Sequence, residues 1–375
     1  MSTDFDLIVV GGGSGGHVYP LAAIARSLKE KAVSSGIDIK LLLMGGSFIK
    51  KVADENGLTY KIISAGKLRR YGSIQNFFDI ARFFIGFLQS AWHIFWFMPD
   101  VVFTKGGAVS IAPALIAKLF FIPVYIHESD SIPGIANRLI GKIANRVFIS
   151  FKSAEKVFED SKIIFTGNPV RRSLMTGDRN EAKNYFELPD ERPTILILGG
   201  SQGARIINEI VLSSLVALTE KYNVIHQCGE NQFESVKKGV DTILKESSQQ
   251  YAEPVQRYYR YFAFLNESSL SLAYALCYIV VSRAGAGALF EIAQIGKPSI
   301  IVPIAQSSNN HQYFNAFEFN LSGGYMIEES GFNSVSLMHA IEFLLGPEKY
   351  KQTSERIRTF ATPDAADIIA MELLK

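Results

Sequence analysis

The chain has 375 residues, of which 48% are hydrophobic, and its formal net charge is +2. This length suits about two domains of ~150 residues, and the small net charge gives no reason to expect nucleic acid as a partner. The two cysteines, Cys228 and Cys277, lie in apolar runs, so we expect no disulfide framework and a reduced, cytosolic setting. The first apolar run, residues 7–10, is too short for a signal peptide.

A glycine-rich loop opens the first half of the chain. It follows the buried strand predicted over residues 7–10 and precedes a helix-like run over residues 20–31. Such a turn brings backbone N–H groups and the positive end of a helix dipole to one point, which suits phosphates. The loop also has the dinucleotide-binding spacing, in Gly11, Gly13 and Gly16. A dinucleotide site needs an acidic residue at the end of the second strand, and an ATP-binding loop needs a following Lys-Ser/Thr. The sequence has neither, so we expect no nicotinamide or flavin cofactor.

His17 stands at the expected start of the first helix, where the helix dipole disfavours a charged imidazole. A neutral imidazole can accept a proton from an attacking hydroxyl, so His17 is a candidate general base. On position alone, a capping or packing histidine is an equally good interpretation.

Strands and helices alternate through the rest of the first half. Further strands are predicted over residues 39–44, 101–104, 124–127 and 147–150, and a helix over residues 111–119. This alternation is typical of a parallel, doubly wound α/β sheet.

Residues 74–98 break the alternation with a long aromatic helix, in which Phe77, Phe84, Trp92 and Trp96 stand among other apolar residues. Its polar residues recur at three- and four-residue spacing, which argues for one polar face and against a transmembrane span; they are Gln75, Asn76, Asp79, Arg82, Gln89, Ser90 and His93. A basic cluster of Lys67, Arg69 and Arg70 precedes the helix. Apolar aromatics beside cations predict docking on an anionic membrane. The alternative is that the aromatic face packs on the sheet as core, and part of the face could do both.

The second half repeats the scheme after a Gly- and Pro-containing linker over residues 166–172. Strands are predicted over residues 194–198, 223–227, 258–262, 278–282 and 299–303. A second glycine loop follows the first of them, and its Ser201 and Gln202 offer hydrogen-bond donors at a helix start.

A third turn of small residues follows the fourth of these strands, at Ala286, Gly287 and Ala288. Glu291 comes next, in the helix, and could accept hydrogen bonds from both hydroxyls of a ribose; an ordinary exposed Glu is the alternative. The polar segment 303–312 follows a buried strand, where ligands of parallel sheets bind.

Arg171, in the linker, could reach a diphosphate, with a structural ion pair as the alternative. The six histidines are scattered, and Asp4-Phe-Asp6 lies at the opposite end of the sheet. We therefore expect no metal site.

Eight ordered segments, spread over nearly the whole chain, together carry a family resemblance. They are Gly11-Gly-Gly-Ser-Gly-Gly-His-Val-Tyr-Pro20, Phe103-Thr-Lys-Gly-Gly107, His127-Glu128 with Pro133-Gly134 and Asn137, Gly167-Asn-Pro-Val-Arg171, Leu198-Gly-Gly-Ser-Gln-Gly-Ala-Arg205 with Asn208, Val224-Ile-His-Gln-Cys-Gly229, Ser282-Arg283 with Gly285 and Glu291, and Gln312-Tyr-Phe-Asn-Ala316. With them the chain resembles the MurG family, the transferases of glycosyltransferase family 28 that make lipid II.

The resemblance implies a GT-B fold, with two Rossmann-like domains facing each other across a cleft. Residues 1–166 would bind acceptor and membrane, residues 167–353 would bind the UDP-sugar, and a helix over about residues 354–375 would pack back on the first domain. The implied reaction is inverting transfer of N-acetylglucosamine from UDP to undecaprenyl-pyrophosphoryl-N-acetylmuramyl-pentapeptide. It belongs to peptidoglycan synthesis, and so to cell shape and division. The implied setting is peripheral, on the cytoplasmic face of the cell membrane, with other cell-wall synthesis enzymes as further partners. Alternatives are another membrane-associated GT-B enzyme, such as a diacylglycerol glucosyltransferase, or a UDP-sugar 2-epimerase.

The resemblance also implies roles for individual residues. The donor would be bound by Ser14, Gly15, Gly16, Asp130, Arg171, Ser201, Gln202, Asn208, Leu265, Ala286, Gly287, Ala288, Glu291, His311 and Gln312. The acceptor would be bound by Gly13, Ser14, Lys105, Gly106, Gly107 and Asn137. His17 would be the general base, with Glu128 and Asp130 as alternatives, and no metal would be needed. Two positions depart from the family pattern: Asp130 replaces a neutral amide, and His311 replaces the first of two glutamines.

Overall fold

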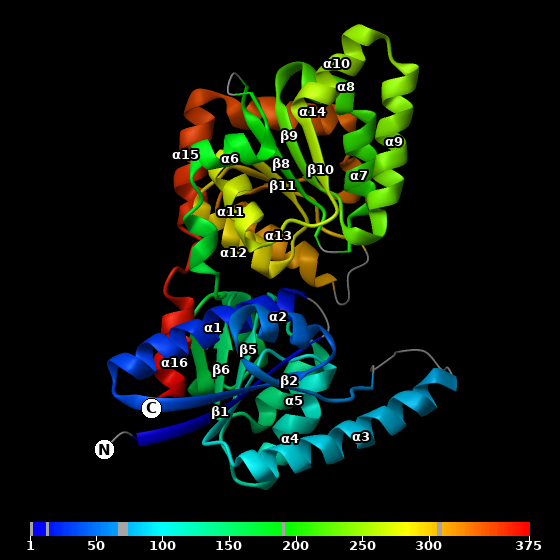
Figure 1. The fold of residues 1–375 in the computed structure, drawn as a ribbon. Coiled ribbons are helices and arrows are strands. Elements are labelled where there is room, and N and C mark those ends of the chain that lie inside the picture. The colour runs from blue at the N-terminus through cyan, green and yellow to red at the C-terminus, as the bar shows by residue number, and fades with distance from the viewer. Residues whose placement is uncertain (1–2, 13–14, 67–73, 190–191, 201, 306–309) are drawn as a thin grey trace. The chain divides into compact units, whose positions relative to one another are not determined.

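A computed structural model of the chain describes residues 3–12, 15–66, 74–189, 192–200, 202–305 and 310–375. Within these ranges, the side chains of residues 3, 15–17, 51 and 74–78 lie outside the description. The chain divides into two compact units: unit 1 is Met1–Arg171 with Thr362–Lys375, and unit 2 is Arg172–Ala361. Each unit is a twisted sheet flanked by helices (Figure 1).

Unit 1 contains a seven-stranded parallel sheet in the order β3-β2-β1-β4-β5-β6-β7. Its strands are β1 (Thr3–Gly11), β2 (Ile37–Gly45), β3 (Thr59–Ile62), β4 (Val101–Thr104), β5 (Val124–Glu128), β6 (Arg146–Ile149) and β7 (Ile163–Phe165). Its helices are α1 (Gly15–Ser34), α2 (Phe48–Asn56), α3 (Ile74–Phe97), α4 (Ile111–Leu119), α5 (Ile135–Ile143) and α16 (Ala365–Leu373).

Helices cover both faces of this sheet, so its central strands are continuous apolar runs. Along β1 the side chains alternate between two cores: Leu7 and Val9 pack in the core that α1 and α16 close, and Ile8 and Val10 pack in the core that α3, α4 and α5 close. The strand order reverses between β1 and β4, and parallel sheets bind ligands outside the carboxyl ends of the strands at such a switch point.

Unit 2 repeats this plan with six parallel strands in the order β10-β9-β8-β11-β12-β13. The strands are β8 (Thr194–Leu198), β9 (Asn223–Gln227), β10 (Tyr259–Phe262), β11 (Ile279–Ser282), β12 (Ser299–Ile301) and β13 (Tyr325–Met326). The helices are α6 (Arg179–Phe186), α7 (Arg205–Ser213), α8 (Leu215–Lys221), α9 (Phe233–Glu246), α10 (Gln249–Tyr258), α11 (Glu267–Leu276), α12 (Ala286–Ile295), α13 (His311–Leu321), α14 (Ser334–Leu345) and α15 (Pro347–Arg358). Its switch point lies between β8 and β11.

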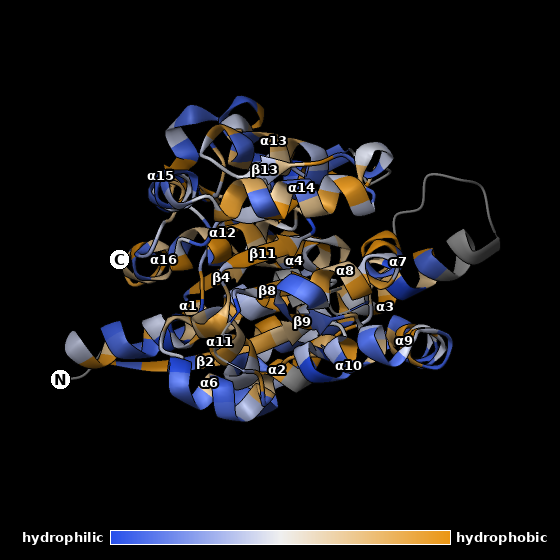
Figure 2. Cartoon of the chain, turned by 90° about the horizontal axis from the view of Figure 1, so that it is seen from above, coloured by the Kyte–Doolittle hydropathy of each residue, from blue (hydrophilic) through white to orange (hydrophobic). Residues whose placement is uncertain are grey.

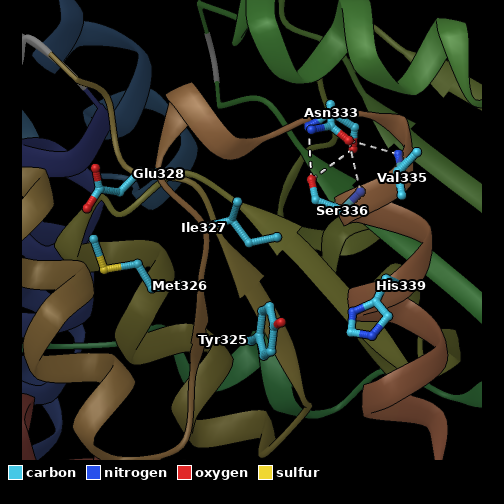
Figure 3. Close-up of a pocket in the computed structure, with 8 residues that line it drawn as sticks. All are labelled: Tyr325, Met326, Ile327, Glu328, Asn333, Val335, Ser336 and His339. Atoms are coloured by element: carbon cyan, nitrogen blue, oxygen red, sulfur yellow. Dashed lines mark hydrogen bonds between the residues drawn. The ribbon is translucent and has the colours of Figure 1, made fainter.

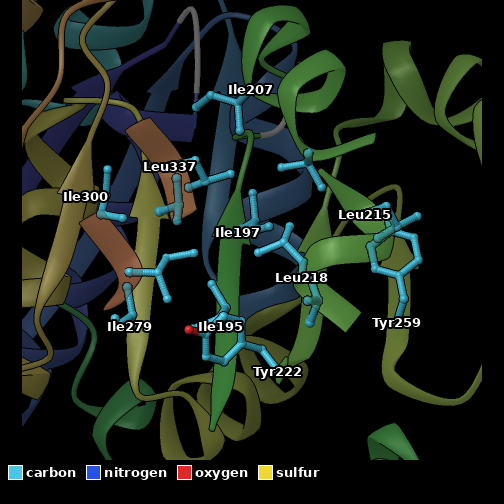
Figure 4. Close-up of a cluster of buried hydrophobic side chains, with 14 of the residues drawn as sticks. Ile195, Ile197, Ile207, Leu215, Leu218, Tyr222, Tyr259, Ile279, Ile300 and Leu337 are labelled. Carbon is cyan, nitrogen blue, oxygen red and sulfur yellow. The ribbon is translucent and has the colours of Figure 1, made fainter. Parts of the chain in front are cut away.

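Ile195 and Ile197 of β8 stand at the centre of one core of unit 2, between Leu218 of α8 and Leu337 of α14 (Figure 4). Hydropathy changes from the centre of unit 2 to its outside: β11 is hydrophobic, whereas the outer helices α6 and α9 are largely hydrophilic (Figure 2).

The predicted doubly wound α/β class and the predicted strands are confirmed in both units. The sequence did not indicate β3, β7 and β13, which are short strands at or near the sheet ends and are not fully buried. Such strands lack the continuous apolar run of a central strand.

The C-terminal segment differs from the single helix predicted over about residues 354–375. The chain forms α15, which belongs to unit 2, and then α16, which belongs to unit 1. Pro363 stands between them and disfavours a helical conformation at the preceding residue. Within unit 1, α16 packs on α1, and Asp367 accepts a 2.7 Å hydrogen bond from Ser27. The units divide at Arg171–Arg172, slightly beyond the predicted division at 166–167.

Candidate active site

The first glycine loop leaves β1 at the switch point of unit 1. Val10 of β1 pairs with Thr104 of β4, so the residues after β4 emerge beside the loop. The N–H of Lys105 donates to the carbonyl of Val10 over 3.0 Å, and a Cβ on Gly107 would lie 3.8 Å from the carbonyl oxygen of Gly12. The two segments predicted to meet the acceptor therefore share one edge of the sheet.

Gly106 and Gly107 turn away from β4 with φ of +82° and +81°, a region that side chains disfavour. A Cβ on Gly106 would lie 1.7 Å from Oδ1 of Asn137, so this position admits glycine only. The same Oδ1 accepts a 3.3 Å hydrogen bond from the N–H of Gly107. Three predicted acceptor residues are thus in mutual contact.

Lys105 lies beneath this turn and is fully buried. Its Nζ lies 2.6 Å from Nδ1 of His127 and 3.2 Å from Oδ1 of Asn168, and it also donates to the hydroxyl of Ser129. Because Lys105 donates to Nδ1, the proton of His127 is on Nε2, which lies 2.9 Å from the carbonyl oxygen of Gly167. This placement favours a positioning role for Lys105 over the predicted direct contact with an acceptor diphosphate.

Burial dominates the titration of this network. It lowers the pKa of Lys105 to about 7, although the nearby carboxylates of Glu128 and Asp130 act in the opposite direction. The pKa of His127 falls well below its ordinary value, first through burial and then through the charge of Lys105. His127 is therefore a neutral link between Lys105 and the backbone at Gly167.

Glu128 ends β5 and holds the loop that follows it. Its carboxylate accepts 2.8 Å hydrogen bonds from the N–H of Asp130 and from Nδ2 of Asn137, and a 3.3 Å bond from the N–H of Gly134. It is 3% exposed, and burial raises its pKa to about 8, with Asp130 as the second cause. These contacts favour a positioning role for Glu128, whereas Asp130 is only half-buried.

The remaining site residues predicted in unit 1 lie at or near the start of α1. Gly15 and Gly16 form its first turn, and His17 follows them. The positions of Gly13 and Ser14, and the side chain of His17, lie outside the described residues. Arg171 is buried, and its guanidinium carbon lies 4.4 Å from the ring centroid of Tyr19, which places a cation beside α1.

The second glycine loop occupies the switch point of unit 2, since Leu198 of β8 pairs with Ser282 of β11. Gly203 and Gly229 have φ of +89° and +90°, and a Cβ on Gly229 would lie 2.1 Å from the nitrogen of Gly203. The loop therefore rests directly on the turn after β9. Gln202 is exposed, and Ser201 lies outside the described residues.

Asn208, predicted to face the donor sugar, is instead buried under this loop. Its Nδ2 donates to the carbonyl of Cys228 over 2.9 Å, and its Oδ1 lies 3.0 Å from Nε2 of His226. The hydroxyl of Tyr259 lies 2.8 Å from Nδ1 of the same imidazole. Because Oδ1 only accepts, Nε2 carries the proton, and burial lowers the pKa of His226 to about 3. The chain of bonds supports the carbonyl of Cys228 beneath the glycine loop, a role that the sequence did not suggest.

The turn of small residues after β11 forms the first turn of α12, at Ala286, Gly287 and Ala288. Cβ atoms added to Gly285 or Gly287 would meet nothing within 4 Å, so the space at this helix start is open to a ligand. Further along α12, Glu291 is half-buried and its Oε2 accepts a 3.0 Å hydrogen bond from the buried Tyr274.

Leu265 follows β10 at the same edge of the sheet. It is buried, and its N–H donates to Oε1 of Gln227 over 3.1 Å. His311 and Gln312 begin α13 after β12, and Oε1 of Gln312 accepts from the N–H of Ile304 over 3.3 Å. The described donor residues of unit 2 thus come from the carboxyl side of four strands.

A surface hollow of unit 2 lies apart from these residues. It has a volume of about 910 Å³ and lies between β13 and the start of α14, where the side chain of Asn333 accepts from the N–H groups of Val335 and Ser336 (Figure 3). None of the predicted site residues lines it. Among the described residues, no group of three or more His, Cys, Asp or Glu is placed to hold a metal ion.

The helix α3 presents its apolar side outward. Phe84, Trp92 and Trp96 are 62%, 63% and 67% exposed, and the surface continues onto the turn after α4, where Phe121 is 94% exposed. Two of its polar residues face inward: Ser90 is fully buried, and the side chain of Gln89 accepts from the N–H of Ser64. Arg82, by contrast, is 61% exposed.

Ile94 of this helix is fully buried in the core, and Phe87, Ala91 and Phe97 pack against it, so part of the aromatic face serves unit 1. Lys67, Arg69 and Arg70, and the side chain of Phe77, lie outside the described residues. In the described part of the chain, no helix is both long and apolar enough to cross a membrane.

Comparisons with known proteins agree with this architecture. A family model described as the glycosyltransferase family 28 N-terminal domain matches residues 7–149, and the model of the C-terminal domain matches residues 194–369. A UDP-N-acetylglucosamine--N-acetylmuramyl-(pentapeptide) pyrophosphoryl-undecaprenol N-acetylglucosamine transferase of Clostridium botulinum is 36% identical over 340 residues, 90% of each chain. A protein of the same name from Clostridium perfringens is 34% identical over 349 residues, 92% of each chain.

Solved structures show the same fold. The MurG of Acinetobacter baumannii has a TM-score of 0.71 at 22% identity, covering 99% of both chains. A UDP-GlcNAc 2-epimerase from Neisseria meningitidis has a TM-score of 0.69 at 15% identity, also covering 99% of both chains. The predicted GT-B class of two Rossmann-like domains is confirmed.

Proposed function

The chain belongs to glycosyltransferase family 28 and, within it, to the MurG family, and from this premise we propose that it transfers N-acetylglucosamine from UDP-N-acetylglucosamine to undecaprenyl-pyrophosphoryl-N-acetylmuramyl-pentapeptide. This is the reaction in the names of the relatives that share about a third of its residues. The observation that carries the proposal is that each parallel sheet has a glycine loop at its switch point, so that each unit offers a phosphate-binding edge.

The donor would bind to unit 2. The open first turn of α12, from Ala286 to Ala288, supplies backbone N–H groups for the diphosphate, and Glu291 supplies acceptors for the ribose hydroxyls. Leu265 would lie beside the uracil, Ser201 and Gln202 near the phosphates, and His311 and Gln312 on the sugar side. Asn208 would act by supporting the loop.

The acceptor would bind to unit 1, with its diphosphate near the first glycine loop and the turn of Gly106 and Gly107. Asn137 and Glu128 hold that turn and the loop after β5 in place. The family resemblance also assigns Ser14, Gly15 and Gly16 to donor binding, and Arg171 would add a positive charge for a diphosphate.

The reaction would invert the anomeric carbon. A hydroxyl oxygen of the acceptor forms a bond to that carbon, the bond from the carbon to the β-phosphate oxygen breaks, and UDP leaves with the bonding electrons. The proton of the hydroxyl passes to His17, with Asp130 as the alternative base. We propose that helix N-termini and Arg171, with no resident metal, stabilise the charge on UDP.

The apolar surface of α3 and of the turn after α4 would dock the enzyme peripherally on the cytoplasmic face of the membrane, where its acceptor is anchored. The outward side chains of Trp92, Trp96 and Phe121 support this reading. The basic residues Lys67, Arg69 and Arg70 would add attraction to anionic lipids.

UDP release tests the proposal. Purified protein is given UDP-N-acetylglucosamine with either the undecaprenyl muramyl acceptor or diacylglycerol, and the products are separated. We expect release only with the muramyl acceptor. Release with diacylglycerol alone would indicate a glycolipid synthase. Conversion of the donor into its C2 epimer without an acceptor and without net release of UDP would indicate a 2-epimerase.

A further inference from the structure

A nearly buried ion pair joins two segments on the carboxyl side of the unit 2 sheet. Nη2 of Arg283, directly after β11, lies 2.6 Å from Oε1 of Glu329, which begins a short 3₁₀ turn after β13 (Glu329–Gly331). Their side chains are 14% and 13% exposed. A pair removed from water in this way is stable only when further hydrogen bonds complete its geometry.

Those further bonds go to one stretch of backbone, the residues that follow β12. Nη1 of Arg283 donates to the carbonyl of Val302 over 3.1 Å, and Oε2 of Glu329 accepts from the N–H of Ala305 over 3.0 Å. Between them, the N–H of Ile304 donates to Gln312. Side chains from three elements therefore hold backbone groups that have left the sheet ladder.

This stretch lies between two parts of the proposed donor site. It leads along the chain toward His311 and Gln312, which are expected on the sugar side, and it is tied through Arg283 to the segment that opens α12. Asn315 of α13 makes a separate bond to the same segment before α12, since its Nδ2 donates to the carbonyl of Ala284 over 3.2 Å.

We infer that Glu329 is a positioning residue for the donor sugar, which acts through Arg283 and the backbone of residues 302–305 and does not itself touch the substrate. The inference rests on the proposed function of unit 2. The two halves of the donor would then depend on different residues. The uridine half would depend on Leu265 and Glu291, which are bonded to Gln227 and Tyr274. The sugar half would depend on the stretch that Glu329 holds.

The test compares binding of UDP with binding of UDP-N-acetylglucosamine by calorimetry, in the wild type, in Glu329→Gln and in Glu329→Ala. The readout is the ratio of the two dissociation constants, because partial misfolding would weaken both by the same factor. We expect the affinity for UDP-N-acetylglucosamine to fall about tenfold, as for loss of a charged hydrogen bond, with little change for UDP. The change Glu328→Gln, at the exposed neighbouring position, is the matched control and should leave the ratio unchanged.

If the affinities for the two ligands fall by the same factor, or if neither affinity changes in either variant, the inference is overturned while the donor site stays in place. A wild type that binds neither ligand would overturn the proposed function and the inference with it. The two failures are thus distinguished by the wild-type titration alone.

Discussion

The hydroxyl of Tyr274 donates a 3.0 Å hydrogen bond to Oε2 of Glu291, from a ring that is 2% exposed. Tyr274 belongs to α11 and Glu291 belongs to α12, so the bond links two helices of unit 2. A buried donor of this kind fixes the orientation of a carboxylate before any ligand arrives. Glu291 is therefore held in one orientation, as its proposed ribose-binding role would require.

Replacing Tyr274 with Phe removes this bond and retains the ring. We expect UDP binding to weaken about fivefold, corresponding to about 1 kcal/mol, with a smaller loss for 2′-deoxy-UDP, which has one ribose hydroxyl fewer. Calorimetric titration with both nucleotides checks this. Tyr222→Phe alters another buried phenol of unit 2, beside the start of β9, and should change neither affinity. Equal losses for the two nucleotides would argue against a ribose role for Glu291.

His17→Ala should lower turnover by about a hundredfold or more while UDP affinity stays near that of the wild type, because the general base acts only in the chemical step. Steady-state UDP release with the muramyl acceptor, together with UDP titration, checks this. If His17→Ala keeps its turnover and Asp130→Ala loses it, Asp130 is the base.

Glu128→Gln should mainly lower the melting temperature, since that carboxylate holds the loop of Asp130 and Gly134.

The main features of the fold could be predicted because continuous apolar runs such as β8, followed by glycine turns, are typical of buried parallel strands. The break before α16 could have been read from Pro363. The partners of Lys105 could not, because Asn168 is distant in sequence and a Lys beside two glycines equally suggests a phosphate ligand. Tyr274 and Glu329 gave no local signal either, since their roles depend on which helices and strand ends the fold brings together.

Lys105 should make the stability of unit 1 depend on pH. Burial lowers its pKa in the folded chain to about 7, from an ordinary value of 10.5. Between these values the unfolded chain binds more protons than the folded chain, so this group's contribution to stability rises with pH and falls as the pH drops toward 7. Lys105→Met lacks that contribution, and its uncharged side chain leaves the acceptors on His127 and Asn168 without their donor.

The melting temperature of Lys105→Met should therefore lie below that of the wild type by a margin that grows from pH 8 to pH 10. Thermal melts of both proteins at pH 8, 9 and 10 check this. A margin that is constant over this range would show that Lys105 stays charged in the folded chain.

Chelation offers a test of the proposed metal-free reaction. If the first turn of α12 and Arg171 stabilise the leaving diphosphate, UDP release should be unchanged after treatment with EDTA. The assay compares initial rates with EDTA, without it, and after addition of Mg²⁺. A loss of rate that Mg²⁺ restores would contradict this assignment.

On α3 the usual orientation of an amphipathic helix is reversed, because apolar side chains face solvent and polar side chains face the protein. Gln89 and Ser90 face the protein, whereas Leu88 and Trp92 are 69% and 63% exposed. Contiguous exposed apolar side chains cost free energy in water unless another surface covers them. A lipid surface would cover them at no loss of internal packing, because Phe87, Ile94 and Phe97 already supply the contacts with the core.

Replacing both Trp92 and Trp96 with Ser should weaken binding to anionic vesicles by about tenfold or more, since each aromatic side chain would otherwise leave water on docking. Vesicle flotation measures the bound fraction, and unchanged UDP affinity shows that unit 2 is intact. Phe343→Ser, which removes a 43% exposed aromatic from α14 of unit 2, is the matched control and should bind vesicles like the wild type. Raised salt should weaken wild-type binding if Lys67, Arg69 and Arg70 contribute attraction to the lipid. If the double variant binds vesicles as well as the wild type, α3 is not the docking surface.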